Sequence, residues 1–206
     1  MKTPQGWYYE SVRKDLLQRY WHTRRFTEVG KLVSPVKGKV LDIGCADGLF
    51  SKQILDKSKA NELIGIDIEK SSVDWAGKHW QKNKKMIFKT ADAHNLKFEN
   101  GTFDAVVALE VLEHVEHPLK VLGEIKRILK KGGYGIFMVP TDNQLFRIVW
   151  WLWLNFYPRG YVWRETHIQT YSHDYLSEIC RRAGFIIEVK KNFILGMLQI
   201  VKVRKN

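Results

Sequence analysis

The segment KVLDIGCADGLF, residues 39–50, is a hydrophobic run that ends in a turn bearing two glycines. Val40, Leu41 and Ile43 predict a short buried strand, and apolar residues recur at helical spacing beyond Gly48. Glycines in a strand-to-helix loop let backbone N–H groups approach a ligand, and the helix N-terminus favours a negatively charged group. The segment therefore predicts a loop that holds a nucleotide-type cofactor.

The same loop lacks two common phosphate-binding patterns. The dinucleotide fingerprint G-x-G-x-x-G would need glycine at 44, 46 and 49, where the chain has Gly44, Ala46 and Leu49. A Walker-type loop would need a following Gly-Lys-Ser/Thr, which is absent from the sequence. Asp42 and Asp47 also put negative charge where a pyrophosphate would lie. The loop therefore suits a ligand without phosphates, and a positively charged ligand fits it.

Composition sets the broad class of the protein. With 206 residues, 45% of them hydrophobic, and no linker-like or repeated segment, the chain is expected to form one domain. Its two cysteines, Cys45 and Cys180, are far apart, and the start MKTPQGWYYESVRK has no apolar signal region, so a cytoplasmic location is expected. The net charge of +12 fits attraction to nucleic acid, anionic lipid or an acidic metabolite, and equally a solvated basic surface.

Strand-like and helix-like segments alternate through the middle of the chain. Strands are expected at ELIGID (62–67), KMIFKTAD (85–92), FDAVVALE (103–110) and YGIFMVP (134–140), with helices between them. Two last runs, FIIEVKKNF (185–193) and GMLQIVKVR (196–204), are too close for a crossover helix and should pair antiparallel. We predict a doubly wound, mostly parallel, seven-stranded α/β sheet of Rossmann-like type with an antiparallel last strand.

Four regions are expected within the single domain. They are an amphipathic helical segment (1–36), a cofactor-binding core (37–140), an aromatic substrate-side insertion (141–172), and a C-terminal helix with a strand pair (173–206). Ligands of such sheets collect beyond the carboxyl ends of the strands. Asp67 and Asp92 end two strands there, so they are candidates for a ribose and an adenine amino group. Taken singly, each could equally be a helix cap or a solvated loop carboxylate.

The segments VLDIGCADG, IGIDIEKSSV, KTADAHNLKFENGTFDAVVALEVLEHVEHP and ILKKGGYGIFMVP together resemble the class I S-adenosylmethionine-dependent methyltransferases. The resemblance covers roughly residues 39–140. It implies S-adenosylmethionine as cofactor, with a methionyl pocket shaped by the glycine loop, a ribose site, an adenine site and a residue facing the cofactor. The implied cofactor-binding residues are Asp42, Gly44, Ala46, Gly48, Asp67, Ile68, Asp92, Ala93 and Leu109. Ala46 stands where the family usually has glycine, and a β-carbon is tolerable there if the residue keeps a negative φ.

The segment EVLEHVEHP (110–118) resembles the quinone-biosynthesis type of these enzymes. That resemblance associates Glu110, Glu113 and His114 with a divalent ion, or makes His114 a general base. Alternatively, His114 packs in the crevice wall and Glu113 is solvated. We predict catalytic roles for His114, Glu110 and His167, and we predict no metal site.

The aromatic insertion contains LFRIVWWLWLNFYPRGYVWRETHIQTYS (145–172). Its apolar run, residues 148–154, is far shorter than the ~18 residues that span a bilayer. It could form a lid over an apolar substrate, an interfacial helix on anionic lipid, or a helix packed on the sheet edge. ETHIQTYS resembles an H-x-x-x-Phe/Tyr element at the mouth of the site, which makes His167 and Tyr171 substrate-side candidates.

We therefore predict an enzyme that moves a methyl group from S-adenosylmethionine to a small, apolar or amphiphilic acceptor. It would be cytoplasmic, with peripheral contact to anionic membrane. An RNA methyltransferase is the first alternative, favoured by the charge, although Leu-Glu-Val-Leu stands where an Asn-Pro-Pro-Tyr/Phe element would mark an amino-group target. A cofactor-binding adaptor without catalysis is the second.

Overall fold

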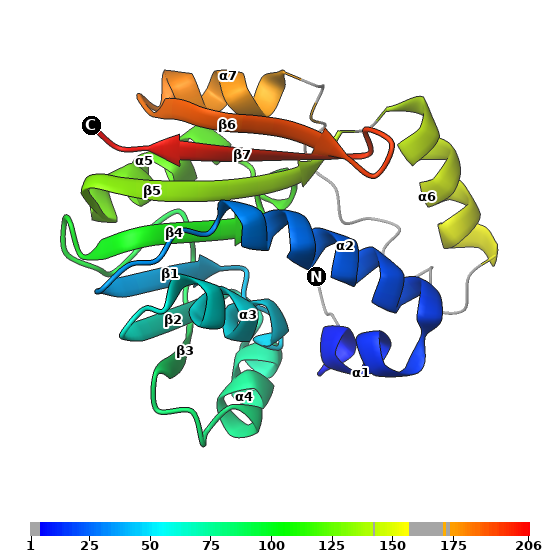
Figure 1. The fold of residues 1–206 in the computed structure, drawn as a ribbon, viewed down its shortest axis with the longest axis horizontal. Helices are drawn as coiled ribbons and strands as arrows, with labels where there is room; N and C mark the ends of the chain where they lie inside the picture. Colours follow the sequence, from blue (N-terminus) through cyan, green and yellow to red (C-terminus); the bar gives the residue numbers. More distant parts are fainter. Residues whose placement is uncertain (1–4, 142, 157–170, 172–173) are drawn as a thin grey trace.

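A computed structural model describes residues 5–141, 143–156, 171 and 174–206, and its centre is a seven-stranded sheet in the order β3-β2-β1-β4-β5-β7-β6 (Figure 1). The strands β1 to β5 pair parallel, and β7 pairs antiparallel with both β5 and β6. The predicted fold class is confirmed. The strands are β1 (Lys39–Ile43), β2 (Glu62–Asp67), β3 (Met86–Thr90), β4 (Phe103–Leu109), β5 (Leu129–Pro140), β6 (Ile186–Phe193) and β7 (Leu198–Arg204).

Helices cover both faces of the sheet, so each face has its own apolar core. The α5 and α7 side includes Val121, Leu122 and Ile179, and the α2 and α3 side includes Val29 and Ile54. A strand buried on both faces reads as a continuous apolar run, which explains the composition of β1 and β4. The helices are α1 (Trp7–Lys14), α2 (Leu16–Leu32), α3 (Leu49–Ser58), α4 (Lys70–His79), the 3-10 turn η1 (Leu112–His114), α5 (Pro118–Ile128), α6 (Gln144–Phe156) and α7 (Tyr175–Arg182).

The N-terminal segment differs from the single amphipathic stretch that was expected. Asp15 divides it, because its side chain accepts hydrogen bonds from the N–H groups of Leu17 and Gln18 and so caps α2. The buried face of α2 is largely polar rather than apolar, with Gln18, His22, Arg25 and Glu28 all buried. A helix can bury such a face only where the polar groups find partners or a ligand.

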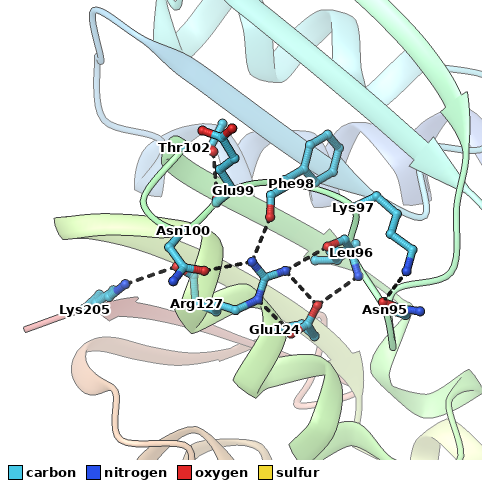
Figure 2. Close-up of polar contacts among 10 residues, drawn as sticks. All are labelled: Asn95, Leu96, Lys97, Phe98, Glu99, Asn100, Thr102, Glu124, Arg127 and Lys205. Carbon is cyan, nitrogen blue, oxygen red and sulfur yellow. Dashed lines mark hydrogen bonds and ion pairs between the residues drawn. The ribbon is translucent and has the colours of Figure 1, made fainter.

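The loop between β3 and β4 is fixed from α5, as Figure 2 shows. The guanidinium of Arg127 donates hydrogen bonds to the carbonyl oxygens of Leu96 and Phe98 and pairs with Glu124. The Glu124 carboxylate in turn accepts from the Leu96 N–H at 2.9 Å. This network holds the segment that follows Asp92 against α5.

Candidate functional site

A cavity of about 810 Å³ lies beyond the carboxyl ends of the parallel strands. Its floor comes from the ends of β1, β2 and β4, and residues of α1, α2 and α6 form its other walls. Figure 1 shows α1, the start of α2 and α6 on this side of the sheet. The N-terminal helices and α6 therefore enclose one site together with the glycine loop.

The lining of the cavity is acidic, although the chain carries a net charge of +12. Eight carboxyl residues line it, against one arginine, Arg25, among the described residues. Closely spaced carboxylates in a poorly solvated site attract a cation and repel phosphate. The eight are Asp42, Asp47, Asp67, Glu69, Asp92, Glu110, Glu113 and Glu116.

The glycine loop approaches its neighbours closely. Gly44 and Gly48 have positive φ values of 72° and 77°. An added Cβ would lie 2.4 Å from Val111 at the first position and 2.6 Å from Phe88 at the second, so only glycine fits either. Ala46 does not keep a negative φ, because its φ is +45°. Its N–H donates to Asp67 Oδ2 at 2.9 Å. The left-handed backbone of Ala46 points the N–H at that oxygen, and it strains the residue because of its Cβ.

Asp67, at the end of β2, already accepts one backbone hydrogen bond on each carboxylate oxygen. Ala46 N–H binds Oδ2 and Glu69 N–H binds Oδ1, both at 2.9 Å. A carboxylate has about four acceptor positions, so one remains on each oxygen. Two vicinal hydroxyl groups match that arrangement. Ile68, the next residue, lines the cavity with its side chain exposed.

Asp42, on β1, is buried and accepts a hydrogen bond from Ser51 Oγ at 2.6 Å. Burial raises the pKa of this carboxyl to about 7, and the negative charge of Asp67 adds to the shift. The group is therefore held close to its ionisation point near neutral pH. A bound cation would favour its charged form.

Asp47 was missed as a site residue in the sequence analysis. Its carboxylate accepts from Tyr9 N–H of α1 at 2.8 Å and from Leu49 N–H of α3 at 3.1 Å. Trp80 Nε1–H donates to the Asp47 carbonyl oxygen at 2.9 Å. Burial raises the pKa of Asp47, in spite of these bonds. The residue thus ties the N-terminal helix to the glycine loop, a contact with no sequence signal because 38 residues separate the partners.

The adenine-side candidates lie on another wall of the cavity. Asp92 accepts from His94 N–H and contacts His94 Nδ1, both at 2.8 Å, and these bonds lower the pKa of its carboxyl. Ala93 and Leu109 also line the cavity. Asp92 is half exposed, so its carboxylate has room for a further donor. Eight of the nine predicted cofactor-side residues therefore line the cavity. The ninth, Gly48 of the glycine loop, does not line it but packs against Phe88 and Trp80.

The end of β4 carries the acidic segment from Glu110 to His114. Glu110 has a positive φ of 56° and pairs with Arg25 of α2 at 2.7 Å. Glu113 is buried, which contradicts the alternative that it is solvated, and its two carboxylate oxygens have no hydrogen-bond partner within the described part of the chain. Burial and the nearby Glu110 raise the pKa of Glu113 well above its usual value. His114 lines the cavity. Within the ranges given above, no three His, Cys, Asp or Glu side chains are placed to hold a metal ion.

Arg25 and His22 were also missed, because a helix pattern does not say what a buried polar face meets. Arg25 NH1 lies 3.0 Å from His22 Nδ1, and its guanidinium stacks over the Phe50 ring with 4.9 Å to the ring centroid. An arginine only donates, so Nδ1 accepts and the His22 proton sits on Nε2. Burial lowers the pKa of His22 well below its usual range, which agrees with a neutral ring.

The aromatic insertion divides into two described parts. On α6, Phe146, Trp150 and Trp153 line the cavity at i, i+4 and i+7, while Trp151 and Phe156 face outward. Tyr171, expected beside the substrate, is instead buried in the apolar core, where its hydroxyl donates to the Leu112 carbonyl oxygen at 3.0 Å. His167 lies outside the described residues. Among the described helices, none is both long enough and apolar enough to cross a bilayer.

Comparison with known proteins agrees with this geometry. A family model described as a methyltransferase domain matches residues 12–188. A ubiquinone biosynthesis O-methyltransferase of Pelagibacter ubique is 34% identical over 55% of this chain and 46% of its own length. A ubiquinone biosynthesis O-methyltransferase of Coxiella burnetii is 29% identical over 63% of this chain and 60% of its own length. The matched region thus spans about half of the length of these relatives.

Solved structures share the fold. A putative methyltransferase in complex with the Haloferax volcanii Trm112 activator superposes with a TM-score of 0.77 at 18% identity, covering 97% of this chain and 96% of that one. An S-adenosylmethionine-dependent methyltransferase of Mesorhizobium loti gives a TM-score of 0.70 at 17% identity, covering 87% and 96%. At such identities the likeness extends to the fold alone.

Proposed function

This chain belongs to the class I S-adenosylmethionine-dependent methyltransferases, and we propose that it transfers the methyl group of that cofactor to a small, apolar or amphiphilic acceptor. The acidic lining of the cavity carries the proposal. S-adenosylmethionine bears a positive sulfonium and a positive amino group and has no phosphate. Eight carboxyl residues around a loop that rejects phosphate fit that charge pattern better than a dinucleotide.

The ribose, the adenine and the cationic groups of the cofactor have matching groups in the cavity. The two remaining acceptor positions of Asp67 suit the ribose hydroxyls, and Asp92 suits the adenine amino group. Asp42, half ionised near neutrality, becomes fully charged beside a cation. When bound, the cofactor supplies an electrophilic methyl group on sulfur. The task of the protein is then to hold the acceptor atom in line with that methyl and to exclude water.

The acceptor side of the cavity is aromatic. Five aromatic residues line it, namely Phe146, Trp150 and Trp153 of α6 and Tyr20 and Trp21 of α2. A volume of about 810 Å³ lies at the upper end of ordinary small-molecule sites, so it can hold the cofactor and a modest apolar partner together. Apolar walls of this kind favour an acceptor of the same character.

Acid–base roles follow from the contacts of the candidate groups. We assign His114 as general base for a hydroxyl acceptor, because it lines the cavity one turn beyond β4. Glu110 is held by Arg25, so its role is to fix the α2 face against the end of β4 rather than to exchange a proton. His167, outside the described residues, is the second candidate base.

Two other functions give different expectations. The net charge of +12 favours an RNA methyltransferase. Among the described residues, Arg25 is the one arginine in the lining and no lysine joins it, so the cavity walls offer few partners for RNA phosphates. A non-catalytic adaptor would bind the cofactor in the same cavity without turnover.

Incubation with methyl-labelled S-adenosylmethionine and separated lipid, metabolite, RNA and protein fractions of a cell extract tests the proposal. We expect label in the lipid or apolar metabolite fraction, lost with Asp67→Ala. Label confined to RNA would replace the proposal with the first alternative. Cofactor binding without label in any fraction would replace it with the second.

A further inference from the structure

Exposed apolar side chains gather on two helices that frame the opening of the cavity. On α2 they are Leu16 (76% exposed), Leu17 and Tyr20, and on α6 they include Trp151 (57%) and Phe156 (72%). Leu17 and Tyr20 also line the cavity, as do Val149, Trp150 and Trp153 of α6. We call the outward-facing set the apolar rim; its members are Leu16, Leu17, Tyr20, Ile148, Trp151, Leu152 and Phe156.

The rim is continuous with the interior of the cavity. One face of α6 points inward through Trp150 and Trp153, while the next residues round the helix point outward. The inner and outer surfaces of the opening are therefore both apolar. An apolar molecule entering from an apolar phase would not have to cross water to reach the site.

Charge around the rim decides what can cover it. Residues 7–24 carry four basic and two acidic residues, and α6 carries one arginine and no acid. Arg13, Arg19 and Arg147 are exposed there. A second copy of the chain would bring the same positive charge against itself, which opposes self-association. An anionic lipid surface matches both the charge and the apolar side chains, and tryptophan and tyrosine are favoured at the level of lipid headgroups.

We propose that the apolar rim docks on an anionic lipid surface, so that the methyl acceptor enters the cavity directly from the lipid. The inference rests on the proposed function, since it supplies the route for an apolar acceptor. Docking buries Trp151, Phe156 and Leu16 in the headgroup region while the basic residues meet lipid phosphates. It leaves the cofactor end of the cavity, around Asp67 and Asp92, on the protein side.

Vesicle co-sedimentation tests the proposal with a matched pair of variants. The vesicles are phosphatidylcholine alone or phosphatidylcholine with one-third phosphatidylglycerol. Trp151→Gln removes an exposed rim residue, and Ile186→Gln removes a similarly exposed apolar residue (49%) of β6, which does not line the cavity. Both side chains are solvent-facing, so thermal unfolding should be nearly the same for both variants and the parent protein.

We expect binding to the anionic vesicles only, weakened about tenfold or more by Trp151→Gln and not by Ile186→Gln, and lost at high salt. Equal binding of both variants, binding independent of phosphatidylglycerol, or no co-sedimentation at low salt would overturn the proposal. Light scattering that shows a dimer broken by Trp151→Gln would also overturn it, because a second copy would then cover the rim. Cofactor binding measured without vesicles is a separate readout, so its failure would remove the proposed function and leave the lipid result standing.

Discussion

Replacing Asp42 with asparagine should make the protein more stable and worse at binding its cofactor. The Asp42 carboxyl is buried, and apart from the Ser51 hydroxyl it faces the negative charge of Asp67. Asparagine has nearly the same shape, keeps an oxygen for the Ser51 hydrogen bond, and carries no charge. The substitution therefore removes an unfavourable buried charge from the ligand-free protein, which stabilises it. It also removes a negative charge that would attract the cationic cofactor, which weakens binding.

The size of the effect follows from the raised pKa. The pKa of Asp42 is about 7 in the fold, against 3.8 for the unperturbed group. The folded state then binds a proton that the unfolded state has released, so wild-type stability falls as the pH rises from 3.8 to about 7 and is flat above that. At 1.36 kcal/mol per pH unit, the ionisable Asp42 lowers the free energy of unfolding, relative to a neutral residue, by about 4 kcal/mol at pH 8 and by about 1.5 kcal/mol at pH 5.

Urea unfolding of the ligand-free protein at pH 5 and pH 8 measures this difference. Asp42→Asn should gain about 2.5 kcal/mol more relative to wild type at pH 8 than at pH 5. Asp56→Asn is the control, because Asp56 is exposed on α3 and paired with Lys52 there, and it should change stability by less than about 0.5 kcal/mol. A gain for Asp42→Asn that is the same at both pH values, or a loss at pH 8, would refute the reasoning.

Three further substitutions test the site. Asp67→Ala should weaken cofactor binding by about 1.5–3 kcal/mol, the usual value for hydrogen bonds to a charged group; unchanged affinity in calorimetry with a folded variant would reject the ribose assignment. His114→Ala should lower turnover and leave cofactor affinity nearly intact. Full activity of this variant would mean that His114 has only a packing role, and activity of the parent protein that chelators do not change would exclude a metal role. Ala46→Gly should raise the free energy of unfolding by about 0.5–1 kcal/mol, since relief of left-handed strain exceeds the added chain entropy; a destabilised variant in the same urea titration would contradict the strain at this position.

The sheet could be predicted because its signals are local. Each strand of the core is an apolar run that stops at a turn, and the carboxyl ends of parallel strands meet at one edge. That rule brought together Asp67 and Asp92 from two separate segments, and the family resemblance added Asp42. The same rule located the cavity before its walls were known, since its floor is built from those ends.

The roof of the site could not be predicted, because it depends on contacts distant in sequence. Nothing in the pattern of α2 indicates that Arg25 pairs with Glu110, 85 residues later, or that the His22 ring meets the Tyr8 ring edge to face. The positive φ of Ala46 could not be predicted either, since an alanine normally avoids that region of backbone conformation. The burial of Glu113 was not predicted, because carboxylates on short helices usually face solvent. In the structure the turn η1 places this side chain in the interior.

Calorimetric titration of the purified protein with S-adenosylmethionine, at pH 6 in two buffers of different ionisation enthalpy, tests the central claim most directly. If the acidic cavity is the site of a cationic cofactor, binding should be saturable and should release close to one proton per cofactor, since Asp42 is mostly protonated at that pH and ionises beside the cation. The release should disappear in Asp42→Asn. Absence of binding, or binding with the same heat in both buffers, would contradict the account.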